Sequence, residues 1–194
     1  MKIIVLMFVV MVLGACDGMI AHKKRYYFAL TANGEKSREL LNFYFYKFNS
    51  NFNVDVLKFL PPDHHRSDDE VSTILMVPRM SEREGEDDGT LGWGQWRTCV
   101  KMSSFKTLLV SPHKMITKIH TMHLEFDVTR FTEWHYSDKL AEREQAESLF
   151  LHEIGHGFHL DHDPDKNAVM YENINDAKKN HQKYYDKVAK FLEE

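Results

Sequence analysis

The chain has 194 residues, a formal net charge of −4 and a hydrophobic share of 43%. This length suits one domain whose core is large enough to fold without cross-links. The slight negative charge excludes a general electrostatic attraction to nucleic acid, and the composition is ordinary for a globular protein. We therefore expect a monomeric globular domain with no nucleic-acid partner.

The first residues have the pattern of an export signal. A positively charged start precedes an apolar run over residues 3–13, which is too short to span a bilayer as a mature helix. The run ends in Leu-Gly-Ala-Cys, which resembles the lipobox of bacterial lipoproteins. We expect a signal peptide over 1–15, lipid on Cys16, a tether over 16–25 and anchoring in a bacterial cell envelope. The alternative is an ordinary signal peptide cut near Ala15, which would give a secreted protein.

The next segments predict strands and one helix. Residues 25–31 are rich in strand formers and precede an Asn-Gly turn signal. Residues 35–49 carry apolar side chains at helical spacing. Residues 53–59 alternate as a strand, and residues 71–77 form a second, more apolar strand.

The middle of the chain predicts a charged loop and further strands. The loop is Ser-Glu-Arg-Glu-Gly-Glu-Asp-Asp over residues 81–88. Three strand candidates follow it, over residues 90–96, 106–110 and 122–131.

Two helices complete the domain. Ser137 can cap a helix that begins at Asp138, runs to about Phe158 and buries Leu140 on its apolar face. A second helix covers about residues 176–192. The order of elements indicates an α+β fold, with a twisted mixed sheet of about five strands and a single domain over residues 26–194.

One short run carries most of the chemical information. His-Glu-Ile-Gly-His begins at His152, and a third histidine, His162, lies six residues after the second. A helix turns about 100° per residue, so His152 and His156 point the same way from consecutive turns and can hold one ion. Glu153 lies on the adjacent flank, within reach of a water on that ion. With His162 as third ligand, one position stays open, as in catalytic rather than structural zinc sites.

The run HEIGHGFHLDH resembles the extended zinc motif of metzincin metallopeptidases, and Asn-Ala-Val-Met-Tyr after it resembles their Met-turn. The distance from His162 to Met170 is that of the matrixins. Residues 89–93 are similar to the matrixin edge strand, and residues 123–127 to the strand before the site helix. The resemblance implies a zincin-like catalytic domain with one catalytic zinc and Met170 as the apolar floor beneath it. It also implies an extended peptide substrate along the strand near residues 91–93.

The sequence departs from the family motif at one position. The family's glycine, three residues after the second zinc histidine, is His159 here. Glycine enters the left-handed backbone region freely, whereas histidine does so uncommonly. If the helix continued instead, His159 would share a face with His152 and His156 and could replace His162 as the third ligand. We favour His162, because three ligands from one straight helix wrap poorly around a tetrahedral ion.

The resemblance also raises the question of further metal sites. The family's structural zinc and calcium sites lie in a loop that corresponds to residues 82–88, which has five acidic residues but no histidine. Calcium there is an alternative, and we favour a solvated charge run.

The function that these residues imply is that of a zinc-dependent endopeptidase, with Glu153 as general base and a peptide or protein as substrate. Two alternatives stay open. One is a zinc-containing binding module that has lost peptidase activity, for which the departure at His159 is the argument. The other is a zinc hydrolase of a non-peptide substrate, such as a cell-wall amide.

Overall fold

The structure is a computed structural model, and it describes residues 26–30, 34–61, 71–77, 91–107, 110–173 and 180–193. The predicted signal peptide, Cys16, the tether and the charged loop over 81–88 lie outside these residues. Among the helices that are described, none has the length and apolarity that a bilayer span requires.

A mixed sheet of five strands forms the centre of the fold. The strands are β1 (Tyr26–Leu30), β2 (Leu57–Phe59), β3 (Ser72–Val77), β4 (Gly92–Thr107) and β5 (Val110–Asp127). Their order in the sheet is β2-β1-β3-β5-β4. β1 pairs in parallel with β2 and β3, β3 pairs in parallel with β5, and β4 pairs antiparallel with β5 at the end of the sheet. The predicted α+β class and the five-stranded mixed sheet are confirmed.

Two helices, α2 (Gly34–Asn49) and α4 (Leu140–Gly157), cover one face of the sheet. Aromatic side chains fill the space between them and the strands. The ring of Phe45 in α2 lies 5.3 Å from that of Phe28 in β1 and 6.2 Å from that of Phe150 in α4. Burial of such large apolar side chains is the main driving force that holds these layers together.

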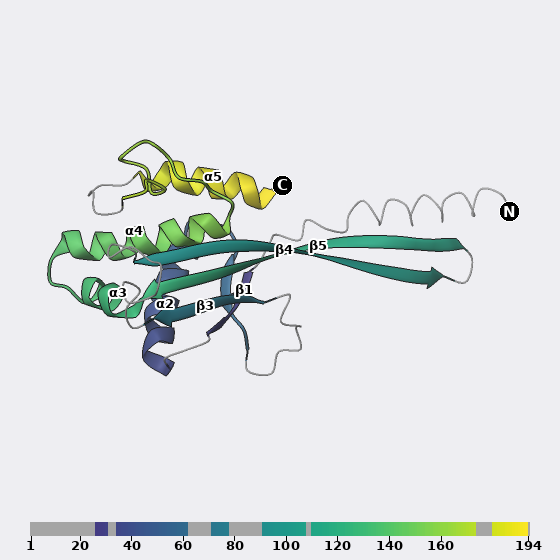
Figure 1. The fold of residues 1–194 in the computed structure, drawn as a ribbon, viewed down its shortest axis with the longest axis horizontal. Coiled ribbons are helices and arrows are strands. Elements are labelled where there is room, and N and C mark those ends of the chain that lie inside the picture. The colour runs from purple at the N-terminus through teal and green to yellow at the C-terminus, as the bar shows by residue number, and fades with distance from the viewer. Residues whose placement is uncertain are drawn as a thin grey trace, which may run out of the picture.

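The two remaining helices, α3 (Val128–His135) and α5 (His181–Glu193), flank α4. α3 follows directly from β5, whereas α5 lies along the side of α4 that faces away from the sheet (Figure 1). Tyr184 and Val188, one turn apart in α5, are both buried. This apolar face fixes α5 against the body of the domain.

β4 and β5 form a long hairpin that the sequence did not predict. The expected strands over 90–96 and 122–131 overlap two long strands that pair from Gly92↔Phe126 to Thr107↔Val110, and the segment 106–110 covers the end of β4 and the start of β5, with 108–109 outside the described residues. β3 pairs with β5 only from residue 123 onwards, so the outer hairpin projects beyond the sheet (Figure 1). A ribbon without a third strand has no single face to bury, and the alternation that marks a half-buried strand is therefore weak there.

The boundary between β5 and α3 also differs from the prediction. The strand expected to continue to residue 131 ends at Asp127. The Asp127 carboxylate accepts a hydrogen bond from the backbone N–H of Arg130 at 2.9 Å and so caps α3. The capping aspartate has the extended backbone typical of an N-cap, which is why the strand can pass into the helix without a loop.

The start of the site helix was predicted two residues too early. α4 begins at Leu140, and the Ser137 hydroxyl accepts from the N–H of Lys139 in the turn before it rather than capping the helix. Leu140, which was expected to be buried, is 62% exposed. The first turn of α4 extends beyond the hydrophobic core. Leu140 is therefore exposed to solvent although it belongs to the predicted apolar face of the helix.

Two further elements are shorter than expected. β2 begins only at Leu57, because the Asn49 side chain accepts hydrogen bonds from the N–H groups of Val56 and Leu57 and orders the preceding turn. The C-terminal helix α5 begins at His181, and residues 176–179 of the predicted helix lie outside the described residues.

Candidate metal centre

α4 carries three of the predicted site residues near its C-terminal end. His152 and Glu153 are buried, and His156 is half-buried. The helix is enclosed here, since every residue from Ser148 to Gly155 is buried. Burying a polar side chain costs free energy unless it has a hydrogen-bond or metal partner. We therefore expect His152 and Glu153 to have such partners.

The helix ends in a Schellman motif with His159 at the position that glycine usually occupies. The N–H of Leu160 donates to the carbonyl of Gly155 at 3.0 Å, and the N–H of His159 donates to the carbonyl of His156 at 3.1 Å. His159 has φ of 59°, the left-handed conformation that the motif requires. The chain therefore turns back after α4, as it does in the family motif, although the glycine is absent.

This turn brings a third histidine to the two on the helix. One ligand atom from each of His152, His156 and His162 lies within 4.8 Å of the other two. The Nε2 atoms of His152 and His156 are 3.2 Å apart. Each of these rings has its Nδ1 atom 3.0 Å from a backbone carbonyl, that of Val169 for His152 and that of Leu160 for His156.

The hydrogen bonds of the two helical histidines fit a bound cation. A carbonyl oxygen only accepts, so each Nδ1 atom donates its proton and each Nε2 atom carries a lone pair. Two lone pairs facing each other at 3.2 Å repel unless a cation lies near both. Two nitrogens bound tetrahedrally to zinc are about 3.4 Å apart, which is close to the spacing here. The donor set of three imidazoles therefore fits a zinc ion with one open position.

His159, the alternative third ligand, lies elsewhere. Its ring stacks on that of Trp96 in β4, with 3.7 Å between ring centroids and 24° between ring planes. It also lies 5.2 Å from the ring of Phe191 in α5. Among the described residues, His162 rather than His159 joins the pair on the helix.

Glu153 lies against the edge strand of the sheet. A Cβ atom on Gly92 would lie 2.5 Å from the Glu153 Oε1 atom, and a Cβ atom on Gly94 would lie 2.5 Å from the Glu153 carbonyl oxygen. Glycine at both positions lets β4 approach the helix this closely. Without a metal ion, burial raises the pKa of Glu153 to about 8, because the charged carboxylate loses its hydration; a dication held by the three histidines would lower this pKa again and favour the carboxylate.

The other side of the site is formed by the loop after His162. The N–H of Asp163 donates to the carbonyl of Met170 at 2.8 Å, which brings the two ends of the loop together. Met170 is buried beside α4, where a Cβ atom on Gly155 would lie 2.3 Å from its Sδ atom. One end of this loop therefore follows His162, and the other packs Met170 against the helix that carries His152 and His156.

Comparison with known families agrees with this geometry. Residues 104–189 match the family model for matrixin. This part of the chain is matrixin-like. The match confirms the predicted resemblance to the metzincin peptidases, supports a zinc metallopeptidase in general terms and makes zinc the expected metal. Among solved structures, archaemetzincin from Methanopyrus kandleri is similar, with 13% identity and a TM-score of 0.48 over 91% of this chain and 99% of that one. A comparison with curated proteins finds no match.

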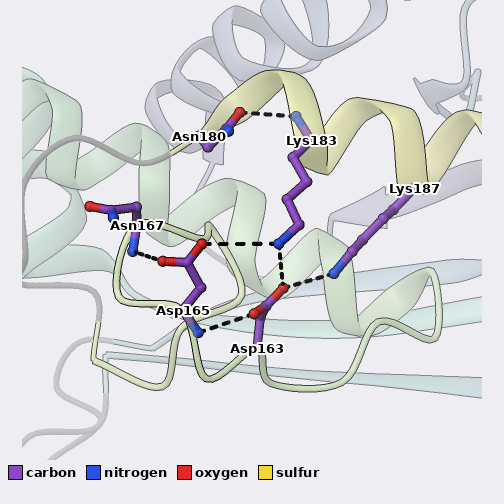
Figure 2. Close-up of polar contacts among 6 residues, drawn as sticks. All are labelled: Asp163, Asp165, Asn167, Asn180, Lys183 and Lys187. Atoms are coloured by element: carbon purple, nitrogen blue, oxygen red, sulfur yellow. Dashed lines mark hydrogen bonds and ion pairs between the residues drawn. The ribbon is translucent and has the colours of Figure 1, made fainter.

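The loop between His162 and Met170 carries a network of hydrogen bonds and ion pairs that the sequence did not indicate. The carboxylate of Asp163 accepts from Lys187 in α5 at 2.9 Å and lies 3.4 Å from the Nζ atom of Lys183 (Figure 2). The hydrogen bond from the Lys187 ammonium, and after it the hydrogen bond from the N–H of Asp165, lowers the pKa of the Asp163 carboxyl to about 2. Lysines in a C-terminal helix normally indicate only a solvated face. No signal in the sequence could therefore have paired Lys183 and Lys187 with the loop after His162.

Two tryptophans, Trp93 and Trp96, lie in the part of β4 nearest to the site helix. Both side chains are partly exposed to solvent, Trp93 to 36% and Trp96 to 44%. Trp93 packs beside His123 of β5, with ring centroids 5.6 Å apart, whereas Trp96 lies under His159. Trp96 therefore supports the turn that leads to His162.

Proposed function

We propose that this protein is a zinc-dependent endopeptidase, with His152, His156 and His162 as metal ligands and Glu153 as general base. The observation that carries the proposal is the convergence of imidazole nitrogens beside a buried carboxylate. Structural zinc sites use four protein ligands, whereas three leave a position for water and substrate. The matrixin match supports peptides as the substrate class.

Zinc, when bound, supplies a Lewis acid and lowers the pKa of bound water to about 7. Glu153 accepts a proton from the attacking water and then transfers it to the amine that leaves as the peptide bond breaks. Its buried position against Gly92 limits the directions in which the carboxylate can point. The hydrogen bonds from the Nδ1 atoms to backbone carbonyls fix the orientation of the His152 and His156 rings.

The edge of β4 is the proposed site for the substrate backbone. β4 lies at the end of the sheet, and its residues Gly92 and Gly94 pack directly against the helix that carries Glu153. A sheet edge offers backbone donors and acceptors that an extended peptide can pair with. A peptide bound there would lie beside the three histidines, which is the position that hydrolysis requires.

The experiment that tests the function compares two proteins that lack residues 1–16, one with Glu153 and one with Glu153→Gln. Both are loaded with zinc and incubated with a diverse peptide library. We expect cleavage by the first protein, and loss of cleavage with retained zinc in the variant, because glutamine keeps the shape of the side chain but cannot accept the proton. Equal cleavage by both proteins would overturn the assignment of Glu153. Zinc binding without cleavage by either would favour a binding module or a non-peptide substrate.

We also propose that the protein is exported and held at a membrane by lipid on Cys16. The basis is the Leu-Gly-Ala-Cys sequence that ends the N-terminal apolar run. Lipid labelling in a bacterial host is expected for the full chain and not for a Cys16→Ser variant. Equal labelling of both would contradict the lipobox assignment.

A further inference from the structure

The loop between His162 and Met170 has to hold two parts of the metal centre at once. Its first residue follows the proposed ligand His162, and its last residue, Met170, packs against Gly155 of the site helix. The carbonyl of Val169, just before Met170, accepts the hydrogen bond that orients the His152 ring. A displacement of this loop would therefore disturb two proposed ligands, His162 directly and His152 through Val169, together with the packing of Met170.

Inside the loop, backbone and side-chain hydrogen bonds define a compact turn. The Asp163 carboxylate accepts from the N–H of Asp165 at 3.1 Å, and the Asp165 carboxylate accepts from the N–H of Asn167 at 3.0 Å (Figure 2). The N–H of Ala168 donates to the carbonyl of Asp165 at 2.9 Å. These contacts shape the loop but are all local, so they do not tie it to the rest of the domain.

α5 supplies the contacts that reach the loop from outside. Lys183 and Lys187 are one turn apart on this helix, and both point toward the carboxylate of Asp163 (Figure 2). The Nζ atom of Lys183 also lies 4.0 Å from the Asp165 carboxylate. The N–H of Asn180, just before the helix, donates to the carbonyl of Asn167 at 2.6 Å. The loop is thus attached to α5 at both its beginning and its middle.

The helix α5, from which these lysines extend, is itself packed against the domain. Tyr184, the residue after Lys183, is buried and lies close to Gly155 of α4, where an added Cβ atom would come within 3.1 Å of its ring. Val188, the residue after Lys187, is fully buried. α5 therefore packs on the site helix with one face and reaches the ligand loop with the next.

The charges of this contact are unequally exposed. The Asp163 side chain is 13% exposed, whereas the side chain of Lys187 is 42% exposed. Ion pairs with an exposed partner add little to global stability. A contact of this kind has its main effect on local order, because it restricts which conformations a loop can adopt while the core stays folded.

We propose that Lys187, supported by Lys183, is a positioning residue of the metal centre: through Asp163 it holds the loop that presents His162. The proposal rests on the proposed function only in taking His162 as the third ligand. α5 contributes no ligand itself. It keeps the loop that presents His162 in one conformation before the metal binds.

The test measures zinc affinity, which separates the inference from any question of catalysis. Wild type, Lys187→Met and Lys190→Met are each titrated with zinc against a chromophoric chelator. Lys190 lies on the same helix and takes part in no ion pair within the described residues, so it is the matched control. Methionine keeps an unbranched apolar side chain and removes the charge. We expect Lys187→Met to weaken zinc binding about five- to tenfold, since contacts one layer beyond the ligands commonly change affinity by about tenfold or more. Lys190→Met should bind as wild type does.

Two additional measurements decide between positioning and general stabilisation. Thermal unfolding of the metal-free proteins should give nearly the same midpoint for Lys187→Met and Lys190→Met, and Lys187→Arg should regain most of the lost zinc affinity, because a guanidinium can still donate to Asp163. A lowered midpoint with unchanged zinc affinity in Lys187→Met would overturn the proposal. Failure of the wild type itself to bind zinc would instead refute the metal centre, so the two failures are distinguishable.

Discussion

The ring of His159 lies flat on the indole of Trp96, with 3.7 Å between the ring centroids. His159 is also the residue that takes the left-handed conformation at the end of α4, with φ of 59°. A left-handed conformation costs a residue other than glycine about 1–2 kcal/mol. The stack offsets part of this cost, because aromatic pairs contribute about 0.5–1.5 kcal/mol beyond the area that they bury.

This relationship predicts coupling between the two positions. Trp96→Ala should lower the free energy of unfolding by about 1 kcal/mol in the wild-type background, because the strained turn loses its support. The same change should cost clearly less in a His159→Gly background, where the turn carries no strain and no stack. Chemical denaturation of the four proteins of this double-mutant cycle measures the coupling. Additive effects would show that the stack does not stabilise the turn.

The identity of the third ligand leads to a second prediction. His162→Ala should weaken zinc binding by more than about a hundredfold, since loss of a ligand costs more than loss of a contact beyond the ligands. His159→Ala should leave zinc affinity within a few fold of wild type, because this ring packs on Trp96 and not beside His152 and His156. Competition with a chelator of known affinity gives both values. The opposite ranking would place the third ligand at His159.

These two residues show what the sequence could and could not predict. The placement of His152, Glu153 and His156 on one helix follows from local geometry, since residues four apart share a face of any helix. The direction of the chain after the helix depends on the conformation of His159. A histidine gives no signal for a left-handed turn, and the residue that stacks on it, Trp96, lies in a distant strand.

The same distinction applies to the fold. The helix α2 could be predicted from the helical spacing of its apolar residues, and β3 from its short apolar run. The full length of β4 and β5 could not, since the outer hairpin lacks such a face. The contact between Lys187 and Asp163 was equally hidden, because an ion pair between distant residues leaves no local pattern.

The two glycines of β4 should differ in what they control. Gly92→Ala should lower turnover by about a hundredfold with little change in stability, because its Cβ atom would meet the Glu153 carboxylate, which can rotate away from its position. Gly94→Ala should instead lower the free energy of unfolding by about 1–3 kcal/mol, because its Cβ atom would meet the Glu153 carbonyl oxygen, which cannot move without the helix. Peptide hydrolysis and denaturant unfolding are measured for both variants. Full activity in Gly92→Ala would show that the carboxylate position is not fixed by β4.

His135, at the end of α3, should make the stability of the protein depend on pH. Burial lowers the pKa of His135 below its usual 6.5 because the charged ring loses hydration. The ring lies 3.1 Å from the hydroxyl of Tyr44, whose pKa burial raises, so that this hydroxyl stays protonated. Below pH 6.5 the unfolded chain therefore binds a proton at His135 more readily than the folded one, and the stability of the folded state falls as the pH falls. Above pH 6.5 both states are neutral at this residue and it adds no pH dependence.

Comparison with His135→Gln isolates this contribution. Free energies of unfolding are measured for both proteins between pH 5 and pH 8 in the presence of a metal chelator, so that the histidines of the metal centre titrate equally in each. The wild type should lose stability relative to the variant as the pH falls below 6.5, and the difference should become constant below the folded-state pKa. If the wild type instead loses stability relative to the variant as the pH rises, the folded state favours the charged ring, which would contradict its burial beside Tyr44.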